Sequence, residues 1–102
     1  MSTITVKSTG YHSVKLIDFS PEMATHFHAI NGGVTINLEN GESIGTRDNL
    51  HVILEKFSRA VSPDKLQNTP VRIEKHVRFY HDGIMSVQKD IVRSNAAAVL
   101  AR

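Results

Sequence analysis

The sequence predicts an α+β fold: a small antiparallel sheet of about five to six strands, arranged as three hairpins, with two to three helices packed on one face. Three observations predict this class. Several segments alternate apolar and polar side chains with a period of two, which is typical of strands. Turn-forming Asn-Gly and Asp-Gly pairs follow such segments. One segment instead repeats its apolar residues at helical spacing.

Length and composition indicate one compact domain spanning residues 1–102, because the chain is 40% hydrophobic and 22% charged. The absence of cysteine excludes disulfides, thiolate catalysis and cysteine zinc sites. The N-terminus lacks a signal-peptide pattern, and no apolar run reaches membrane-spanning length. We therefore expect a cytoplasmic protein that uses no membrane, no cofactor and no metal.

The first third of the chain predicts a hairpin and a helix. Ile4 and Val6 alternate with polar residues, Ser8-Thr9-Gly10 signals a turn, and a second strand follows over Tyr11–Phe19. A helix is then expected to begin at Ser20-Pro21-Glu22, because Ser can cap it and Pro is preset for a first turn. Asn31-Gly32-Gly33 would end this helix.

The middle third predicts a second hairpin and the main helix. Alternation over Val34–Leu38 and the Asn40-Gly41 turn predict two strands, the second containing Ser43-Ile44. An apolar stripe at helical spacing then predicts a helix over residues 50–61, capped by Asp48 or Asn49. Ser62-Pro63-Asp64 begins at most one further helical turn.

The last third predicts a strand over Val71–Tyr80 and a turn at His81-Asp82-Gly83. Residues 84–95 fit either a strand or a helix, since their apolar residues satisfy both periods. The interpretation favoured here is a strand to about Gln88, followed by a helix through Ala96-Ala97-Ala98.

Strand 71–80 carries the main candidate site. Alternation places Val71, Ile73, Val77 and Phe79 on one face, and Arg72, Glu74, His76, Arg78 and Tyr80 on the other. Guanidinium groups contact phosphates, and His and Tyr rings stack on bases. We therefore take four residues as candidate contacts for nucleic acid or another partner: Arg72, His76, Arg78 and Tyr80.

The histidines are weak candidates for a metal site. If residues 20–30 are helical, His26 and His28 point about 200° apart and cannot bind one ion. Two pairs would share a helix face, Glu22 with His26 and His51 with Glu55, but no third ligand is signalled.

Enzymatic alternatives are also weak. Gly41-Glu42-Ser43-Ile44-Gly45 matches the nucleophile-elbow string, but Ser43 would lie in a hairpin strand and not on a strand-to-helix turn. A small enzyme would use His76 or His81 as general base, beside Asp82 or Tyr80.

Residues Asn40-Gly41-Glu42-Ser43-Ile44-Gly45-Thr46-Arg47-Asp48, followed by a helix ending in Phe57, resemble the hairpin-to-helix passage of a family of small phage anti-CRISPR proteins. That family binds and inhibits a type I surveillance complex, so the resemblance implies a small inhibitor that acts by surface contact. It covers roughly a fifth of the chain and transfers no functional residue.

The leading hypothesis is a small non-enzymatic binding or regulatory protein that acts through protein–protein contact, such as an inhibitor of phage or mobile-element type. Its partner would be another protein or a second copy of the chain. Met85, Val87, Ile91 and the Ala-rich C-terminus are candidates for a homodimer contact. The alternative is a nucleic-acid-binding module that uses the basic face of strand 71–80.

Overall fold

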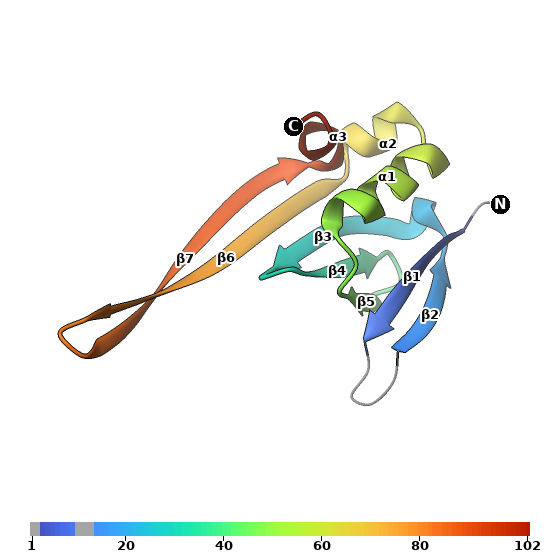
Figure 1. Ribbon diagram of the computed structural model, residues 1–102. Helices are drawn as coiled ribbons and strands as arrows, with labels where there is room; N and C mark the ends of the chain where they lie inside the picture. The colour runs from blue at the N-terminus through green and yellow to red at the C-terminus, as the bar shows by residue number, and fades with distance from the viewer. Residues whose placement is uncertain (1–2, 10–13) are drawn as a thin grey trace.

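The computed structural model describes residues 3–9 and 14–102, and it shows a mixed α+β fold with a seven-stranded sheet (Figure 1). The strands are β1 (Ile4–Thr9), β2 (Val14–Phe19), β3 (Ala24–Ile30), β4 (Gly33–Leu38), β5 (Ser43–Thr46), β6 (Pro70–His81) and β7 (Ile84–Asn95). The helices are α1 (Leu50–Ala60), α2 (Pro63–Gln67) and α3 (Ala96–Leu100), with a single 3₁₀ turn, η1, at Pro21–Met23. The predicted α+β class is confirmed. The turn expected at Gly10 and the strand start at Tyr11 lie outside the described residues.

The sheet is larger than predicted and is not wholly antiparallel. Its strand order is β2-β1-β5-β4-β3-β6-β7. All neighbouring pairs are antiparallel except β3 and β6, which run parallel from the pair Phe27–Val71 to the pair Ile30–Glu74. This parallel pair joins the first five strands to the C-terminal hairpin, so a single sheet runs through the molecule.

The helix predicted over residues 20–30 is wrong, because only η1 is helical and β3 follows it. A β-bulge between Ala24 and His26 shifts the alternation, so that buried side chains fall at Ala24 and Phe27 with a spacing of three. This spacing imitates a helical stripe. Asn31 and Gly32 both have positive φ, 46° and 87°, and form a tight hairpin turn that pairs β3 with β4 instead of ending a helix.

The helix expected after Gln88 is also wrong, because β7 continues as a strand to Asn95. Asp82 and Gly83 form a second tight turn with positive φ, which fixes the register of β6 and β7 over twelve cross-strand pairs. Asn95 then caps α3, accepting a hydrogen bond from the Ala98 N–H at 2.8 Å. The C-terminal helix is therefore a single short one.

The core lies between α1 and the body of the sheet. The helix begins where the Asn49 side chain accepts the His51 N–H at 2.8 Å, and its Ile53, Leu54 and Phe57 are buried. The Phe57 ring meets Phe27 of β3 edge to face, with ring centroids 5.2 Å apart. The core also includes Ala96 and Val99 of α3, whereas Ala98 and Ala101 of the same Ala-rich segment are exposed.

The β6–β7 hairpin projects from this body as an arm, which gives the molecule extents of 56 × 34 × 23 Å (Figure 1). Pairing with β3 stops at Glu74, and the Asn31 side chain then accepts the His76 N–H at 3.1 Å. We call residues 77–92 the arm. No helix in the described ranges is long and apolar enough to cross a membrane.

Candidate functional site

The four residues chosen from the sequence lie on one face of the C-terminal hairpin, which we call the outer face. Opposite residues of an antiparallel pair share a face, so the register shows which β7 side chains join them. The outer-face pairs from the body to the tip are Arg72 with Arg93, Glu74 with Ile91, His76 with Lys89, Arg78 with Val87, and Tyr80 with Met85. The other face, which carries the buried Val71, is the core-side face.

Glu74 is the centre of a charged cluster on the outer face. Its Oε1 lies 3.0 Å from Arg72 Nη2, and its Oε2 lies 2.7 Å from His76 Nε2. His28 of β3 approaches from the neighbouring strand, with its Nε2 3.9 Å from Glu74 Oε1. The Glu74 side chain is only 9% exposed. Alternation along β6 places Arg72 and His76 beside Glu74, and the parallel pairing with β3 adds His28, so three basic side chains surround one carboxylate.

The pKa of Glu74 lies below the ordinary carboxyl value of 4.5. The hydrogen bond with His76 is the largest cause, and the charges of Arg72, His76 and His28 act in the same direction. Burial opposes them by penalising the charged form. Glu74 is therefore a carboxylate at neutral pH and cannot supply a proton there.

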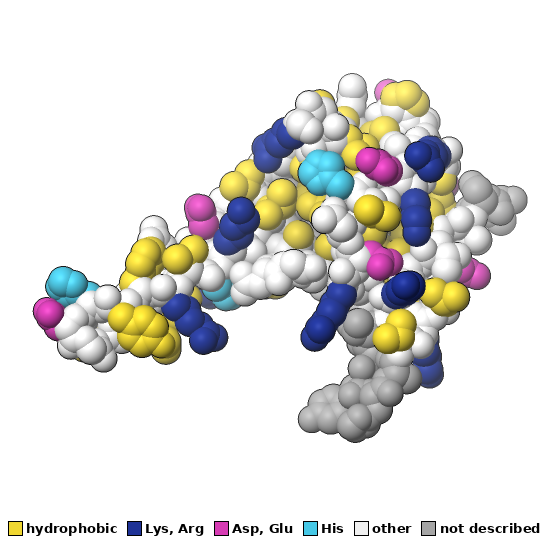
Figure 2. Space-filling view, in the orientation of Figure 1, with side chains coloured by type: hydrophobic (Ala, Val, Ile, Leu, Met, Phe, Trp, Pro, Cys, Tyr) yellow, Lys and Arg dark blue, Asp and Glu magenta, His cyan; other side chains and the backbone are white. Residues whose placement is uncertain are grey.

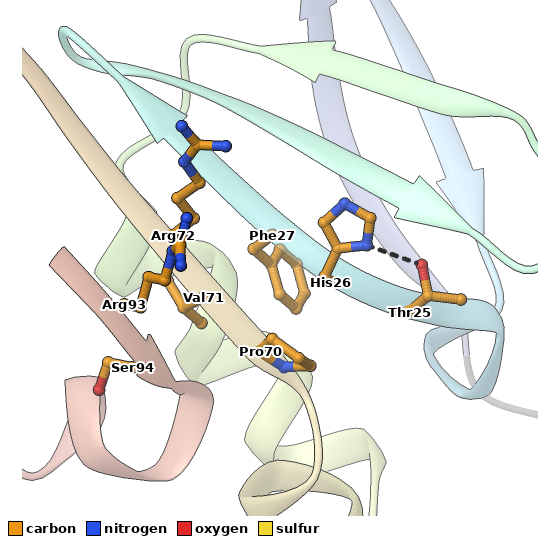
Figure 3. Close-up of a pocket in the computed structure, with 8 residues that line it drawn as sticks. All are labelled: Thr25, His26, Phe27, Pro70, Val71, Arg72, Arg93 and Ser94. Atoms are coloured by element: carbon orange, nitrogen blue, oxygen red, sulfur yellow. Dashed lines mark hydrogen bonds between the residues drawn. The ribbon is translucent and has the colours of Figure 1, made fainter. Parts of the chain in front are cut away.

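A pocket of about 270 Å³ opens beside this cluster. It lies at the N-terminal end of the β3–β6 pairing, whose first pair is Phe27–Val71. Its lining residues are Thr25, His26, Phe27, Pro70, Val71, Arg72, Arg93 and Ser94 (Figure 3). Phe27, Pro70 and Val71 supply apolar contact, while Arg72 and Arg93 stand on adjacent strands at its side (Figure 3). The pocket thus combines apolar surface with two guanidinium groups.

The arm exposes large apolar side chains on both faces. On the core-side face these are Val77, Phe79, Ile84 and Val92, which are 42–72% exposed. On the outer face they are Tyr80, Met85, Val87 and Ile91, which are 39–74% exposed. Figure 2 shows apolar side chains gathered along the projecting hairpin. The β7 strand is also an edge of the sheet, with one side of its backbone unpaired by any described strand.

Of the residues proposed for general-base catalysis, His76 belongs to the Glu74 cluster, whereas His81 and Asp82 lie apart from it. His81 and Asp82 are at the tip of the hairpin, where their side chains are 92% and 86% exposed and 3.4 Å apart. A group this open to water lacks the excluded environment that tunes catalytic acids and bases. Ser43 begins β5 after the Gly41 turn, which is the hairpin position expected from the sequence.

The geometry of the candidate metal-binding histidines differs from the prediction, because His26 and His28 lie on a strand and not on a helix. His26 and His28 lie two residues apart on a strand, so they share a face instead of pointing apart as they would on a helix. Glu22 and His26 are no longer a helical pair, whereas His51 and Glu55 both remain on α1. Within the part of the chain that the structure describes, no three His, Cys, Asp or Glu side chains gather as a metal site.

Sequence reasoning missed three basic residues here: Lys89 and Arg93 on the outer face, and His28 on the neighbouring strand β3. Lys89 and Arg93 fell in the segment expected to be helical, and His28 fell in the other wrong helix. A signal for the β7 pair was present, because Lys89, Ile91 and Arg93 continue the alternation of Met85 and Val87. No comparable signal existed for His28, because parallel pairing between distant strands leaves no local pattern.

Comparison with known proteins gives no relative: no family model, no curated protein and no solved structure matches this chain.

Proposed function

We propose that this chain is a non-enzymatic binding protein that acts through protein–protein contact, and that the core-side face of its arm makes the contact with a second copy of the chain. The observation that carries this proposal is the exposure of Phe79 and Ile84, at 45% and 72%, on a hairpin that extends beyond the body. Contiguous exposed apolar side chains mark interaction surfaces.

The arm has a physical reason to be covered. A two-stranded hairpin is at best marginally stable in water, because it has no second layer to bury its apolar side chains. The body supports the hairpin only as far as Glu74 and His76. A partner surface would supply the missing layer, at the distance of about 10 Å at which sheets stack face to face.

Charge favours a second copy on this face. Among the core-side pairs of the hairpin, Lys75 and Asp90 lie directly opposite each other, so their opposite charges balance. Two such faces can meet through a twofold axis without net repulsion. The outer face carries Arg72, Arg78 and Arg93, so two outer faces would repel each other.

The test is sedimentation of the whole chain from roughly 1 μM to 1 mM, the range of weak protein complexes. The wild type is expected to shift from its monomer mass of 11.3 kDa to the dimer mass as concentration rises. Phe79→Ser/Ile84→Ser should weaken self-association at least about tenfold, because it removes two apolar anchors.

The matched control is Val14→Ser/Leu16→Ser, which removes two apolar side chains that are 67% and 70% exposed on β2. This control should dimerise like the wild type. A strict monomer at the highest concentration, or equal weakening by the control, would overturn the proposal.

A further inference from the structure

We propose that the outer face of the β6–β7 hairpin binds single-stranded nucleic acid. Its phosphates would lie along four cations that we call the cation ladder: Arg72, Arg78, Lys89 and Arg93. This site is independent of self-association, because it uses the opposite face of the hairpin. The sequence suggested only the β6 part of it, and the structure adds the β7 cations and the pocket between β3 and β6.

The first argument is the placement of like charges. Arg72 and Arg93 are directly opposite on the same face of an antiparallel pair, an arrangement that destabilises a sheet. Lys89 follows two rungs further out, and Arg78 one rung beyond it. On the core-side face of the same hairpin, Lys75 is instead matched by Asp90. The excess of cations therefore belongs to the outer face alone, where a bound polyanion would relieve the repulsion.

The second argument is that the only carboxylate among the outer-face pairs is already engaged. Glu74 accepts from Arg72 at 3.0 Å and contacts His76 at 2.7 Å. Two nitrogens of the cluster, Arg72 Nε and His28 Nε2, are buried without a hydrogen-bond partner in the described chain. Glu74 thus leaves Arg78, Lys89 and Arg93 free for another anion, with no ion pair recorded for them in the described residues.

The third argument concerns the size and chemistry of the ligand. Arg72 and Arg78 are six residues apart on one strand, or about 20 Å at ~3.3 Å per residue, so the ladder suits a chain of phosphates and not a single ion. Tyr80, 74% exposed, continues the same face and offers a ring for base stacking. The pocket of about 270 Å³ adds apolar surface beside Arg72 and Arg93 at the other end. Stacking needs unpaired bases, which favours a single strand over a duplex.

The experiment is a fluorescence-anisotropy titration with labelled single-stranded DNA and RNA of about 12 nucleotides, within the site sizes of such binders. The three ladder cations that make no contact with Glu74 predict a slope of log affinity against log salt of about −2, so affinity should fall about 20-fold between 50 and 200 mM salt. Duplex DNA and inorganic polyphosphate are titrated in parallel.

The diagnostic variant is Lys89→Gln/Arg93→Gln, since both side chains are exposed and lie outside the Glu74 contacts. It should bind at least about tenfold more weakly and reduce the salt slope by about 0.7 for each contact removed. Tyr80→Ala should weaken single-strand binding roughly 5- to 150-fold and leave the slope unchanged, because it removes stacking and not charge. The matched control, Arg47→Gln/Arg59→Gln, removes two exposed cations from the body and should bind like the wild type.

Three results would overturn the inference. They are binding weaker than about 100 μM at 50 mM salt, equal loss in the Arg47→Gln/Arg59→Gln control, and duplex or polyphosphate binding as tight as that of single strands. Phe79→Ser/Ile84→Ser separates this inference from the proposed function. It should lose self-association and keep nucleic-acid binding. Lys89→Gln/Arg93→Gln should instead self-associate like the wild type in sedimentation.

Discussion

The body of the sheet and the arm are built from the same kind of strand but differ in what covers them. In β4, Val34, Ile36 and Leu38 alternate with half-buried residues, and they are buried in the same core as Ile53, Leu54 and Phe57 of α1. In the arm the alternation of side chains continues, yet Phe79 on one face and Tyr80 on the other are both exposed. Alternation thus predicts the geometry of a strand, while burial depends on a second layer that the strand itself does not supply.

The largest expected effect is in the body. Phe57→Ala removes a fully buried ring that packs on Phe27, and it should lower the free energy of unfolding by about 3–5 kcal/mol. Urea denaturation of the monomer measures it. Val52→Ala on the same helix, where Val52 is 45% exposed, should change stability by no more than about 0.5 kcal/mol. Similar losses in the two variants would contradict the core position of Phe57.

The joint between body and arm should show an intermediate effect. Asn31→Ala loses the hydrogen bond to the His76 N–H and places alanine at a φ of 46°, so we expect a cost of about 1–3 kcal/mol. Asn31→Gly tolerates the same φ and loses only the hydrogen bond, so it should cost less. Denaturation gives both values, and amide exchange at His76 should accelerate in both variants. An unchanged exchange rate would show that Asn31 does not hold this joint.

A smaller effect is expected at Glu74, and it should depend on pH. Because the pKa of Glu74 is lowered in the fold, its carboxylate stabilises the fold above the ordinary value of 4.5, and this contribution is lost as the pH falls below that value. Glu74→Gln lacks this dependence. Between about pH 6 and pH 3, the wild type should therefore lose more stability than the variant in urea denaturation. If the stability of the wild type and of Glu74→Gln changed equally with pH, the stabilising role of the charged Glu74 cluster would be contradicted.

The smallest effect is expected in the arm. Phe79→Ala at a concentration where the chain is monomeric should change the free energy of unfolding by no more than about 0.5 kcal/mol, because the ring is already 45% exposed. The comparison with Phe57 is made in the same denaturation series. A loss above about 2 kcal/mol in the monomer would mean that Phe79 packs against the body.

Much of the fold could be predicted from local patterns. The hairpin of residues 34–46, the helix at Leu50–Ala60 and the strand after Pro70 agree with the structure, because each has its own period and its own turn or cap residues. The prediction failed for residues 20–30, where a β-bulge gave Ala24 and Phe27 helical spacing. It failed again after Gln88, where the partner strand and not local propensity decides the conformation.

The candidate site was predictable only within one strand. Alternation places Arg72, His76, Arg78 and Tyr80 together, and the register does the same. Pairing partners were beyond this reasoning, since Arg93 faces Arg72 only because the Asp82-Gly83 turn fixes the register. His28 reaches Glu74 through the parallel β3–β6 pair, which joins parts of the chain more than forty residues apart. The predictions that the chain is one domain and uses these residues for contact stay predictions.

The β3–β6 pair also has a consequence for how the molecule folds. The Asn31-Gly32 and Asp82-Gly83 hairpins join neighbouring residues, and such hairpins form within about 1–10 μs. The contact between Phe27 and Val71 must instead close a long loop, whose entropy is lost before any pairing repays it. We therefore expect the β6–β7 hairpin to form early in folding and the β3–β6 pairing to form late. Rapid-mixing kinetics would then show Val71→Ala speeding unfolding more than it slows folding.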